Sequence, residues 1–135
     1  MADFLIDCNH LSAAIRKVST LREKIHQARK QGHKFGTLVA VLCELEAGIQ
    51  QTSKPQEFRR RLSQLLKHIR LWPLDQVSAQ LFGGIYNELR RQGRILSQVD
   101  MMLAALARQR KLKLLTTDKD FQALPDIETE NWIGG

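Results

Sequence analysis

Four acidic side chains could together form a metal-binding site: Asp7, Glu44, Asp100 and Asp118. Asp7 directly follows a short apolar run, where a charge is costly unless it has a partner. If all four meet at one place, their carboxylates repel one another, and a bound hard cation relieves that repulsion. Mg²⁺ prefers oxygen ligands and keeps several of its waters. The four acids therefore predict a Mg²⁺ site of the kind that activates water for hydrolysis.

Each acid taken alone also has a purely structural explanation. Asp100 and Asp118 could each cap a following helix, because carboxylates favour helix N-termini. Glu44 could be a solvated helix residue. Asp7 is the hardest to explain in this way, because it closes an apolar run. Only their convergence at one place would distinguish a shared site from four unrelated acids.

The elements that must position these acids can be read from the hydrophobic pattern. Short apolar runs alternate with longer helical segments, which predicts an α/β fold with a central, mostly parallel sheet of four or five strands. The expected strands are residues 4–6, 35–40, 69–74, 113–116 and 127–132. In open α/β sheets, ligands bind beyond the carboxyl ends of the strands. The acids are expected at that edge, since Asp7 and Asp118 closely follow predicted strands.

Residue types at the helix ends indicate where the helices lie. Asn9 is the expected cap of the first helix, and Asp75 the expected cap of a long helix that stops near Gly93. Asp100 begins a helix that is strongly apolar on one side. The expected helices are residues 11–16, 20–32, the segment that carries Glu44, and residues 55–68, 75–93 and 99–108.

Bulk properties narrow the class of protein. A chain of 135 residues with 43% hydrophobic content is typical of one globular domain, expected over residues 1–135. The formal net charge of +7 is compatible with a polyanionic partner, although a merely soluble basic surface explains it equally well. Two cysteines make no disulfide framework, and neither a signal peptide nor an apolar run of about 18 residues is found. A cytoplasmic protein without a membrane segment is expected.

Other site chemistries have little support in the sequence. None of the four histidines is paired with Cys8 or Cys43 at a ligand-like spacing, so no zinc site is predicted. Neither a Gly-x-Ser-x-Gly elbow nor a Walker-type phosphate loop occurs. The acidic group remains the best candidate for catalysis.

Several short motifs occur in a fixed order along the chain. They are Ile6-Asp7-Cys8-Asn9, Glu44-Leu45-Glu46-Ala47-Gly48, Pro73-Leu74-Asp75, the segment from Gly93 to Asp100 that continues to Ala104-Ala105, Thr116-Thr117-Asp118-Lys119-Asp120-Phe121 and Glu130-Asn131-Trp132. In order and spacing they resemble the PIN domain, and specifically the VapC toxins of bacterial toxin–antitoxin pairs. The resemblance runs nearly from end to end. Two departures are Cys8, where the family usually has Thr or Ser, and Val41, where a hydroxyl residue is common.

The resemblance implies a fold, an activity and partners. The fold would be a PIN-like three-layer α/β/α sandwich, and the activity a Mg²⁺-dependent endoribonuclease, with Mn²⁺ as a possible substitute. The partners would be an RNA substrate, a small antitoxin protein and a second copy of the chain. By position, the acidic site would be Asp7, Glu44, Asp100 and Asp118, with Asp7 and Asp100 as the principal metal ligands and Asp118 as a further one. The supporting residues would be Asn9, Thr116 and Asp120.

Basic residues could supply a path for RNA phosphates, although a solvated charged face explains each of them as well. The candidates are Arg59, Arg60, Arg61, Lys67, Arg90, Arg91 and Arg94. Two alternatives to a toxin stay open: an RNA-processing nuclease with the same domain, and a non-catalytic nucleic-acid-binding module with the same fold. The presence of all four acids argues against the second, because a pure binder gains nothing from carboxylates near phosphate.

Overall fold

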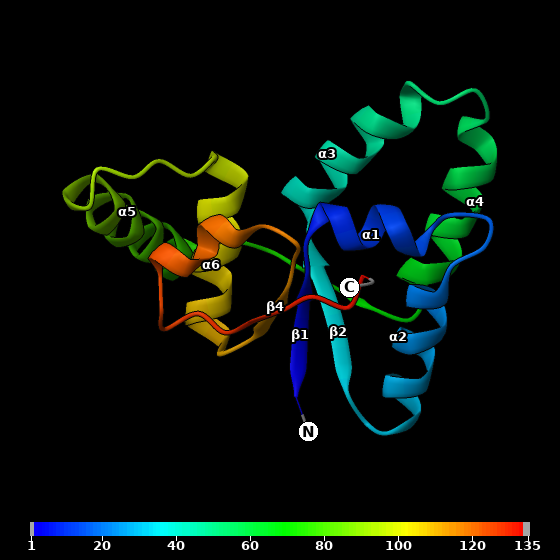
Figure 1. The fold of residues 1–135 in the computed structure, drawn as a ribbon, viewed down its shortest axis with the longest axis horizontal. Coiled ribbons are helices and arrows are strands. Elements are labelled where there is room, and N and C mark those ends of the chain that lie inside the picture. The colour runs from blue at the N-terminus through cyan, green and yellow to red at the C-terminus, as the bar shows by residue number, and fades with distance from the viewer. Residues whose placement is uncertain (1, 134–135) are drawn as a thin grey trace.

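Five parallel strands form the centre of the structure, a computed structural model that describes residues 2–133. The strands are β1 (Asp3–Ile6), β2 (Lys34–Leu38), β3 (Arg70–Trp72), β4 (Lys113–Leu115) and β5 (Thr129–Glu130). Their order in the sheet is β3-β2-β1-β4-β5, and every neighbouring pair is parallel. The three central strands, β2, β1 and β4, are labelled in Figure 1. The expected sheet of four or five strands is confirmed.

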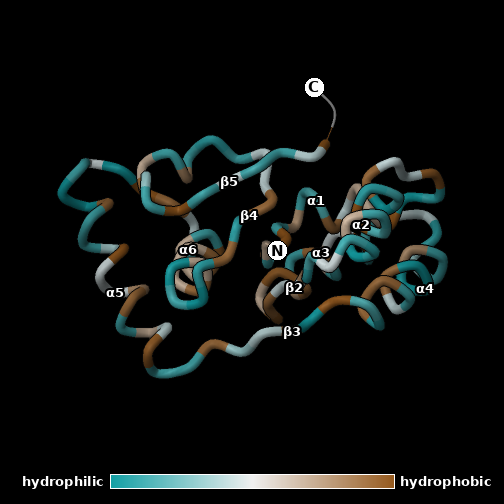
Figure 2. Tube along the Cα trace, turned by 90° about the horizontal axis from the view of Figure 1, so that it is seen from below, coloured by the Kyte–Doolittle hydropathy of each residue, from teal (hydrophilic) through white to brown (hydrophobic). Residues whose placement is uncertain are grey.

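Helices cover both faces of this sheet, so the expected three-layer sandwich is also confirmed. Viewed along the strands, α1 to α4 lie on one side of the sheet and α5 and α6 on the other (Figure 2). Within residues 2–133, no helix is both long and apolar enough to cross a membrane. The helices are α1 (Cys8–Ala14), α2 (Thr20–Lys30), α3 (Val39–Gln50), α4 (Pro55–Leu66), α5 (Gln76–Arg91) and α6 (Gln98–Arg110), with a 3₁₀ turn η1 (Lys119–Ala123).

The core lies between the sheet and its two helical layers. Leu5 and Ile6 of β1 are fully buried, as expected for a central parallel strand that is covered on both faces. The four residues from Leu103 to Leu106 in α6 are fully buried as well. Asp100 lies in the first turn of α6, ahead of this buried stretch.

Several predicted boundaries are corrected by the structure. Asn9 does not cap the first helix: α1 begins at Cys8, and Asp7 is the cap, because its carboxylate accepts the Cys8 backbone N–H. The predicted strand 69–74 shrinks to Arg70–Trp72, since the following proline has no N–H to donate to the sheet. The predicted strand 127–132 shrinks to Thr129–Glu130. The predicted strand 35–40 ends at Leu38, and, as expected, no turn separates it from the helix α3.

Gly36→Ala should destabilise the fold, because Gly36 lies beneath the indole ring of Trp72. A Cβ at Gly36 would lie 2.3 Å from Cζ3 of Trp72, which is itself 6% exposed and has little room to move. Overpacking of this kind costs about 1–3 kcal/mol. The matched control is Gly48→Ala in α3, where a Cβ meets nothing within 4 Å, and helix propensity should add about 0.5–1 kcal/mol of stability. Urea unfolding measures both; equal effects would contradict the proposed clash.

Candidate active site

The carboxyl edge of the sheet brings the acidic residues together. Asp7 follows β1, Asp118 follows β4, and Glu44 lies in α3, which begins directly after β2. Asp100 comes from the first turn of α6. The charge of Asp7 contributes to raising the pKa values of Glu44 and Asp100, and Asp118 contributes to raising that of Asp7. The four acids, expected to converge from their positions in the sequence, therefore form one electrostatic group.

Asp7 is the most buried member of the group, with 5% of its surface exposed. Oδ1 accepts the backbone N–H of Cys8 at 2.6 Å. Oδ2 accepts the hydroxyl of Thr116 at 2.7 Å and the side-chain amide of Asn9 at 3.3 Å. Burial raises the pKa of Asp7, and these hydrogen bonds offset part of that rise. Asn9 and Thr116 therefore hold Asp7 in place.

Thr116 connects Asp7 to the loop after β4. Its buried hydroxyl, besides donating to Asp7, accepts the backbone N–H of Asp118 at 3.0 Å. Asp118 in turn caps η1, since its Oδ1 accepts the backbone N–H of Asp120 at 2.8 Å. The Asp120 side chain is exposed, and its role as a further acid stays a prediction. Asp118 is thus a helix cap, as its structural explanation required, and it still belongs to the acidic group because its charge contributes to raising the pKa of Asp7.

Asp100 is not the cap of its helix. Ser97 has that role, because its hydroxyl accepts the Asp100 backbone N–H at 3.1 Å. Burial raises the pKa of Asp100 to about 6, and the charges of Asp7, Asp118 and Glu44 add to the rise. The Asp100 carboxylate is therefore available for a function other than capping.

The donor set of this group suits a hard divalent cation. All four donors are carboxylates, the ligand type that Mg²⁺ and Mn²⁺ prefer. Across residues 2–133, none of the four forms an ion pair with a basic side chain. In that same part of the chain, no three His, Cys, Asp or Glu side chains already stand in a geometry that could hold a metal ion. The acids therefore influence one another and have no basic partner in residues 2–133, but their side chains would have to move to enclose an ion.

Two residues beside the site were not predicted to take part in it. Burial, with Glu44 and Asp7 adding to it, raises the pKa of the Cys8 thiol to about 11, so the thiol is protonated at neutral pH. His10 is fully buried, and its burial lowers its pKa to about 4. The only sequence signal for His10 is a polar residue beside the apolar positions of the first helix.

The structure separates the predicted RNA-binding cations into different groups. Arg59 pairs with Glu46, and Arg61 donates to the carbonyl of Ile15, so both serve contacts within the fold. Lys67 lies near the amino ends of the strands, in a hollow that it shares with Lys34. Contact between α4 and RNA phosphates stays a prediction, and within α4 it rests mainly on the exposed Arg60. The exposed candidates are Arg60, Lys67, Arg90, Arg91 and Arg94.

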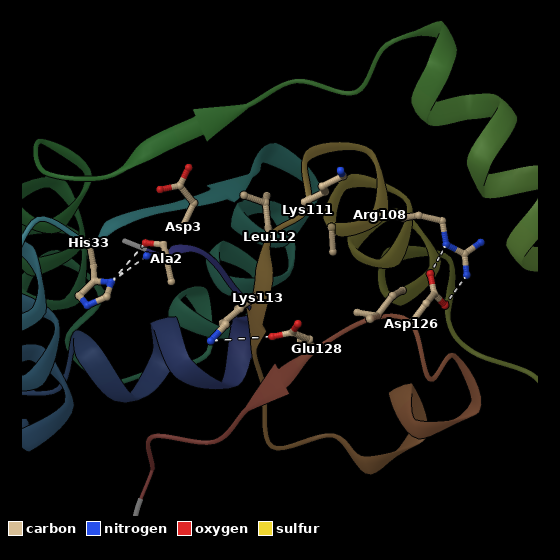
Figure 3. A pocket seen from close by; sticks show the side chains of 11 residues that line it. Ala2, Asp3, His33, Arg108, Lys111, Leu112, Lys113, Asp126 and Glu128 are labelled. Carbon is tan, nitrogen blue, oxygen red and sulfur yellow. Dashed lines mark hydrogen bonds and ion pairs between the residues drawn. The ribbon is translucent and has the colours of Figure 1, made fainter.

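A cavity of about 820 Å³ lies at the opposite edge of the sheet from the acids. Its lining includes Asp3 at the start of β1 and Lys113 at the start of β4 (Figure 3). Two of its basic side chains form ion pairs. Arg108 pairs with Asp126, and Nζ of Lys113 lies 3.8 Å from Oε2 of Glu128. This cavity therefore has neither the acids nor the strand ends expected of the active site.

The chain is similar to known nucleases along most of its length. Residues 4–127 match the family described as PIN domain. Ribonuclease VapC4 of Mycobacterium tuberculosis is 31% identical over 102 residues, which cover 74% of this chain and 78% of the relative. The tRNA(fMet)-specific endonuclease VapC of Shigella flexneri is 29% identical over 134 residues, which cover 98% of this chain and 99% of the relative.

A solved structure shares the fold. VapBC2 from Rickettsia felis, bound to a DNA fragment from its promoter, superposes with a TM-score of 0.86 at 22% identity, covering 96% of this chain and 98% of that one. At this identity the likeness supports the fold alone, and the sequence matches carry the family assignment. The grouped acids at the carboxyl edge fit that assignment. The chain belongs to the PIN-domain family, among its VapC-type ribonucleases.

Proposed function

We propose that this chain is a Mg²⁺-dependent endoribonuclease that hydrolyses RNA phosphodiester bonds at its four grouped carboxylates. The observation that carries the proposal is the convergence of Asp7, Glu44, Asp100 and Asp118 without a basic partner in residues 2–133. Mutually repelling acids are costly for the fold, and such a cost is typical of active sites. Mn²⁺ can use the same oxygen ligands.

The side chains divide into ligands and a proton acceptor. Asp7, Asp100 and Asp118 would hold the ion. Asp7 has about four lone-pair positions and uses three of them on Cys8, Thr116 and Asn9, which leaves one for the ion. When bound, the ion would make a water easier to deprotonate and would offset charge on the phosphate oxygens.

Glu44 would be the proton acceptor. It is the exposed member of the group, and burial together with Asp7 raises its pKa, which makes the carboxylate a stronger base. Glu44 accepts a proton as water attacks the phosphorus, and the bond from phosphorus to the departing nucleotide oxygen breaks. The departing oxygen takes a proton from solvent.

The direct test is cleavage of total RNA by the purified chain. RNA fragments should accumulate with Mg²⁺ and not with a chelator, and adding Mg²⁺ back in excess should restore cleavage. Cleavage that persists at full rate in chelator would remove the metal from the mechanism. Binding of RNA without cleavage under any condition would favour the non-catalytic module.

We further propose that the chain is the toxin of a VapBC-type pair, acting as a homodimer with a small antitoxin. The sequence likeness to VapC4 supports the toxin role, and the solved VapBC2 complex is an example of such a pair on the same fold. Exposed apolar side chains, Leu71 and Val77 among them, offer a surface for a second copy. Expression of the chain alone should stop growth, and co-expression of the small protein encoded beside it should restore growth. Asp7→Asn is the control and should be harmless; a harmless wild type would favour an RNA-processing role.

The cations nearest the acidic edge should carry the salt dependence of RNA binding. Arg94 is exposed in the loop that leads to α6 and Asp100, whereas Lys67 lies at the opposite edge. In an Asp7→Asn background, which binds without cutting, Arg94→Ala should flatten the slope of log affinity against log salt by about 0.7 for one lost contact to single-stranded RNA. Lys67→Ala removes the same charge and should leave the slope unchanged. The reverse result would move the RNA path to the other edge.

A further inference from the structure

His10 is a buried histidine whose two ring nitrogens both have hydrogen-bond partners. No part of its surface is exposed. Nε2 accepts the backbone N–H of Trp132 at 3.0 Å, so this nitrogen carries no proton. The ring proton is therefore on Nδ1, which donates to Oδ1 of Asn9 at 2.7 Å. The contact with Trp132 thus selects the tautomer that Asn9 requires.

The orientation of the Asn9 amide follows from that tautomer. Oδ1 of Asn9 accepts two N–H groups, from His10 and from the backbone of Thr117 at 3.3 Å. Its NH₂ group must then face Oδ2 of Asp7 at 3.3 Å and the Thr116 hydroxyl at 3.4 Å. A flipped amide would place an oxygen against the Asp7 carboxylate. The His10 hydrogen bond is the shortest of the four and opposes that flip.

The partner at the other end of His10 is the C-terminal segment after β5. The ring of Trp132 packs edge-on against Phe4, with the ring centroids 5.0 Å apart. The backbone carbonyl of Trp132 accepts a hydrogen bond from Nζ of Lys24 at 3.2 Å. A second contact holds the segment close to the site: Thr116 donates its backbone N–H to the carbonyl of Glu130 at 3.0 Å. The Trp132 backbone N–H is therefore fixed where His10 needs it.

We propose that His10 is a positioning residue that links the C-terminal segment to the active site. It takes its tautomer from the Trp132 N–H and uses the Nδ1 proton to hold the Asn9 amide in the orientation that supports Asp7. The kinetic consequence rests on the proposed function, whereas the hydrogen-bond link can be tested without it.

Two polar substitutions each remove one of the two hydrogen bonds of the His10 ring and keep the other. In His10→Asn, the amide nitrogen takes the position of Nδ1 and keeps the donor to Asn9, while the acceptor for Trp132 is lost. In His10→Gln, the amide oxygen takes the position of Nε2 and keeps the acceptor for Trp132, while the donor to Asn9 is lost. His10→Leu removes both. Ser78→Ala is the control, because it removes a buried hydrogen-bonding group in α5 that lies outside this link.

The readouts are NMR of ¹⁵N-labelled protein and steady-state cleavage of RNA. In His10→Asn, the Trp132 amide should exchange with solvent at least about tenfold faster, while kcat stays near the wild-type value. In His10→Gln, the Trp132 amide should stay protected, the Asn9 side-chain NH₂ signals should shift, and kcat should fall about tenfold or more with KM unchanged. His10→Leu should show both losses, and Ser78→Ala neither.

Other outcomes would overturn the link. Equal kcat losses in His10→Asn and His10→Gln, or no loss in either, would leave His10 a packing residue only. Unchanged Asn9 signals in His10→Gln would show that the amide does not depend on His10. If the wild type itself does not cleave RNA, the proposed function fails, and the NMR results alone decide whether the link exists.

Discussion

Asp7→Asn and Asp100→Asn should each lower Mg²⁺-dependent RNA cleavage at least about a hundredfold while leaving the fold intact. Loss of a residue that only supports a metal ligand costs about 10–100-fold, so loss of a ligand should equal or exceed the upper end of that range. The fold should survive because Asn caps a helix as well as Asp does, so α1 keeps its cap. The helix of Asp100 is capped by Ser97 and not by Asp100.

A graded series makes this prediction sharper. Thr116→Val removes the hydroxyl that donates to Asp7 at 2.7 Å and should give an intermediate loss of about 10–100-fold. Asp3→Asn changes an exposed acid at the opposite end of the same strand and should leave the rate unchanged. Initial rates at saturating Mg²⁺, with circular dichroism to confirm folding, measure the series. A folded Asp7→Asn or Asp100→Asn variant that cuts at the wild-type rate would show that the ligand assignment is wrong.

Mg²⁺ should stabilise the wild type, and Asp100→Asn should stabilise the metal-free protein. Burial and the neighbouring acids raise the pKa of folded Asp100 to about 6, against about 3.9 in an unfolded chain. The folded state therefore binds the proton more tightly, and ionised Asp100 costs stability. That cost is complete above about pH 6, decreases as the pH falls below it, and is nearly gone near pH 4. In chelator, Asp100→Asn should melt higher than wild type at pH 7.5, and the gap should close towards pH 4.

Adding Mg²⁺ should reverse the order of the melting temperatures of wild type and Asp100→Asn. At a Mg²⁺ concentration of about 100 times its Kd, linkage adds roughly 2.7 kcal/mol to wild type. For a domain of this size that is on the order of 10 °C in Tm. Asp100→Asn has lost a ligand and should respond less, whereas Asp3→Asn should behave as wild type throughout. Thermal unfolding with and without chelator gives all these values; a metal-free Asp100→Asn that melts below wild type at pH 7.5 would remove Asp100 from the shared acidic group.

The sequence by itself determined the layout of the fold and the place of the acids. Short apolar runs alternating with helical segments allow few arrangements other than a parallel sheet covered on both faces. The carboxyl ends of parallel strands meet at one edge, so Asp7 and Asp118 had to lie near each other once their strands were identified. Local chemistry also sufficed for the cap of the long helix: Asp75 caps α5 as expected, and its carboxylate accepts the backbone N–H of Ser78.

The tertiary structure decided which partners each side chain has. Whether Arg59 meets RNA or Glu46, and which sheet edge Lys67 faces, depend on how α4 packs and turns, and no local pattern records this. The sequence predicted Asn9 as the cap of α1, whereas the structure has Asp7. The two could not be told apart from the sequence, because a shift of two residues in a helix start leaves the apolar pattern nearly unchanged. The link from Trp132 through His10 joins residues 122 positions apart, and the pairing of β5 with β4 and of β4 with β1 brings them together.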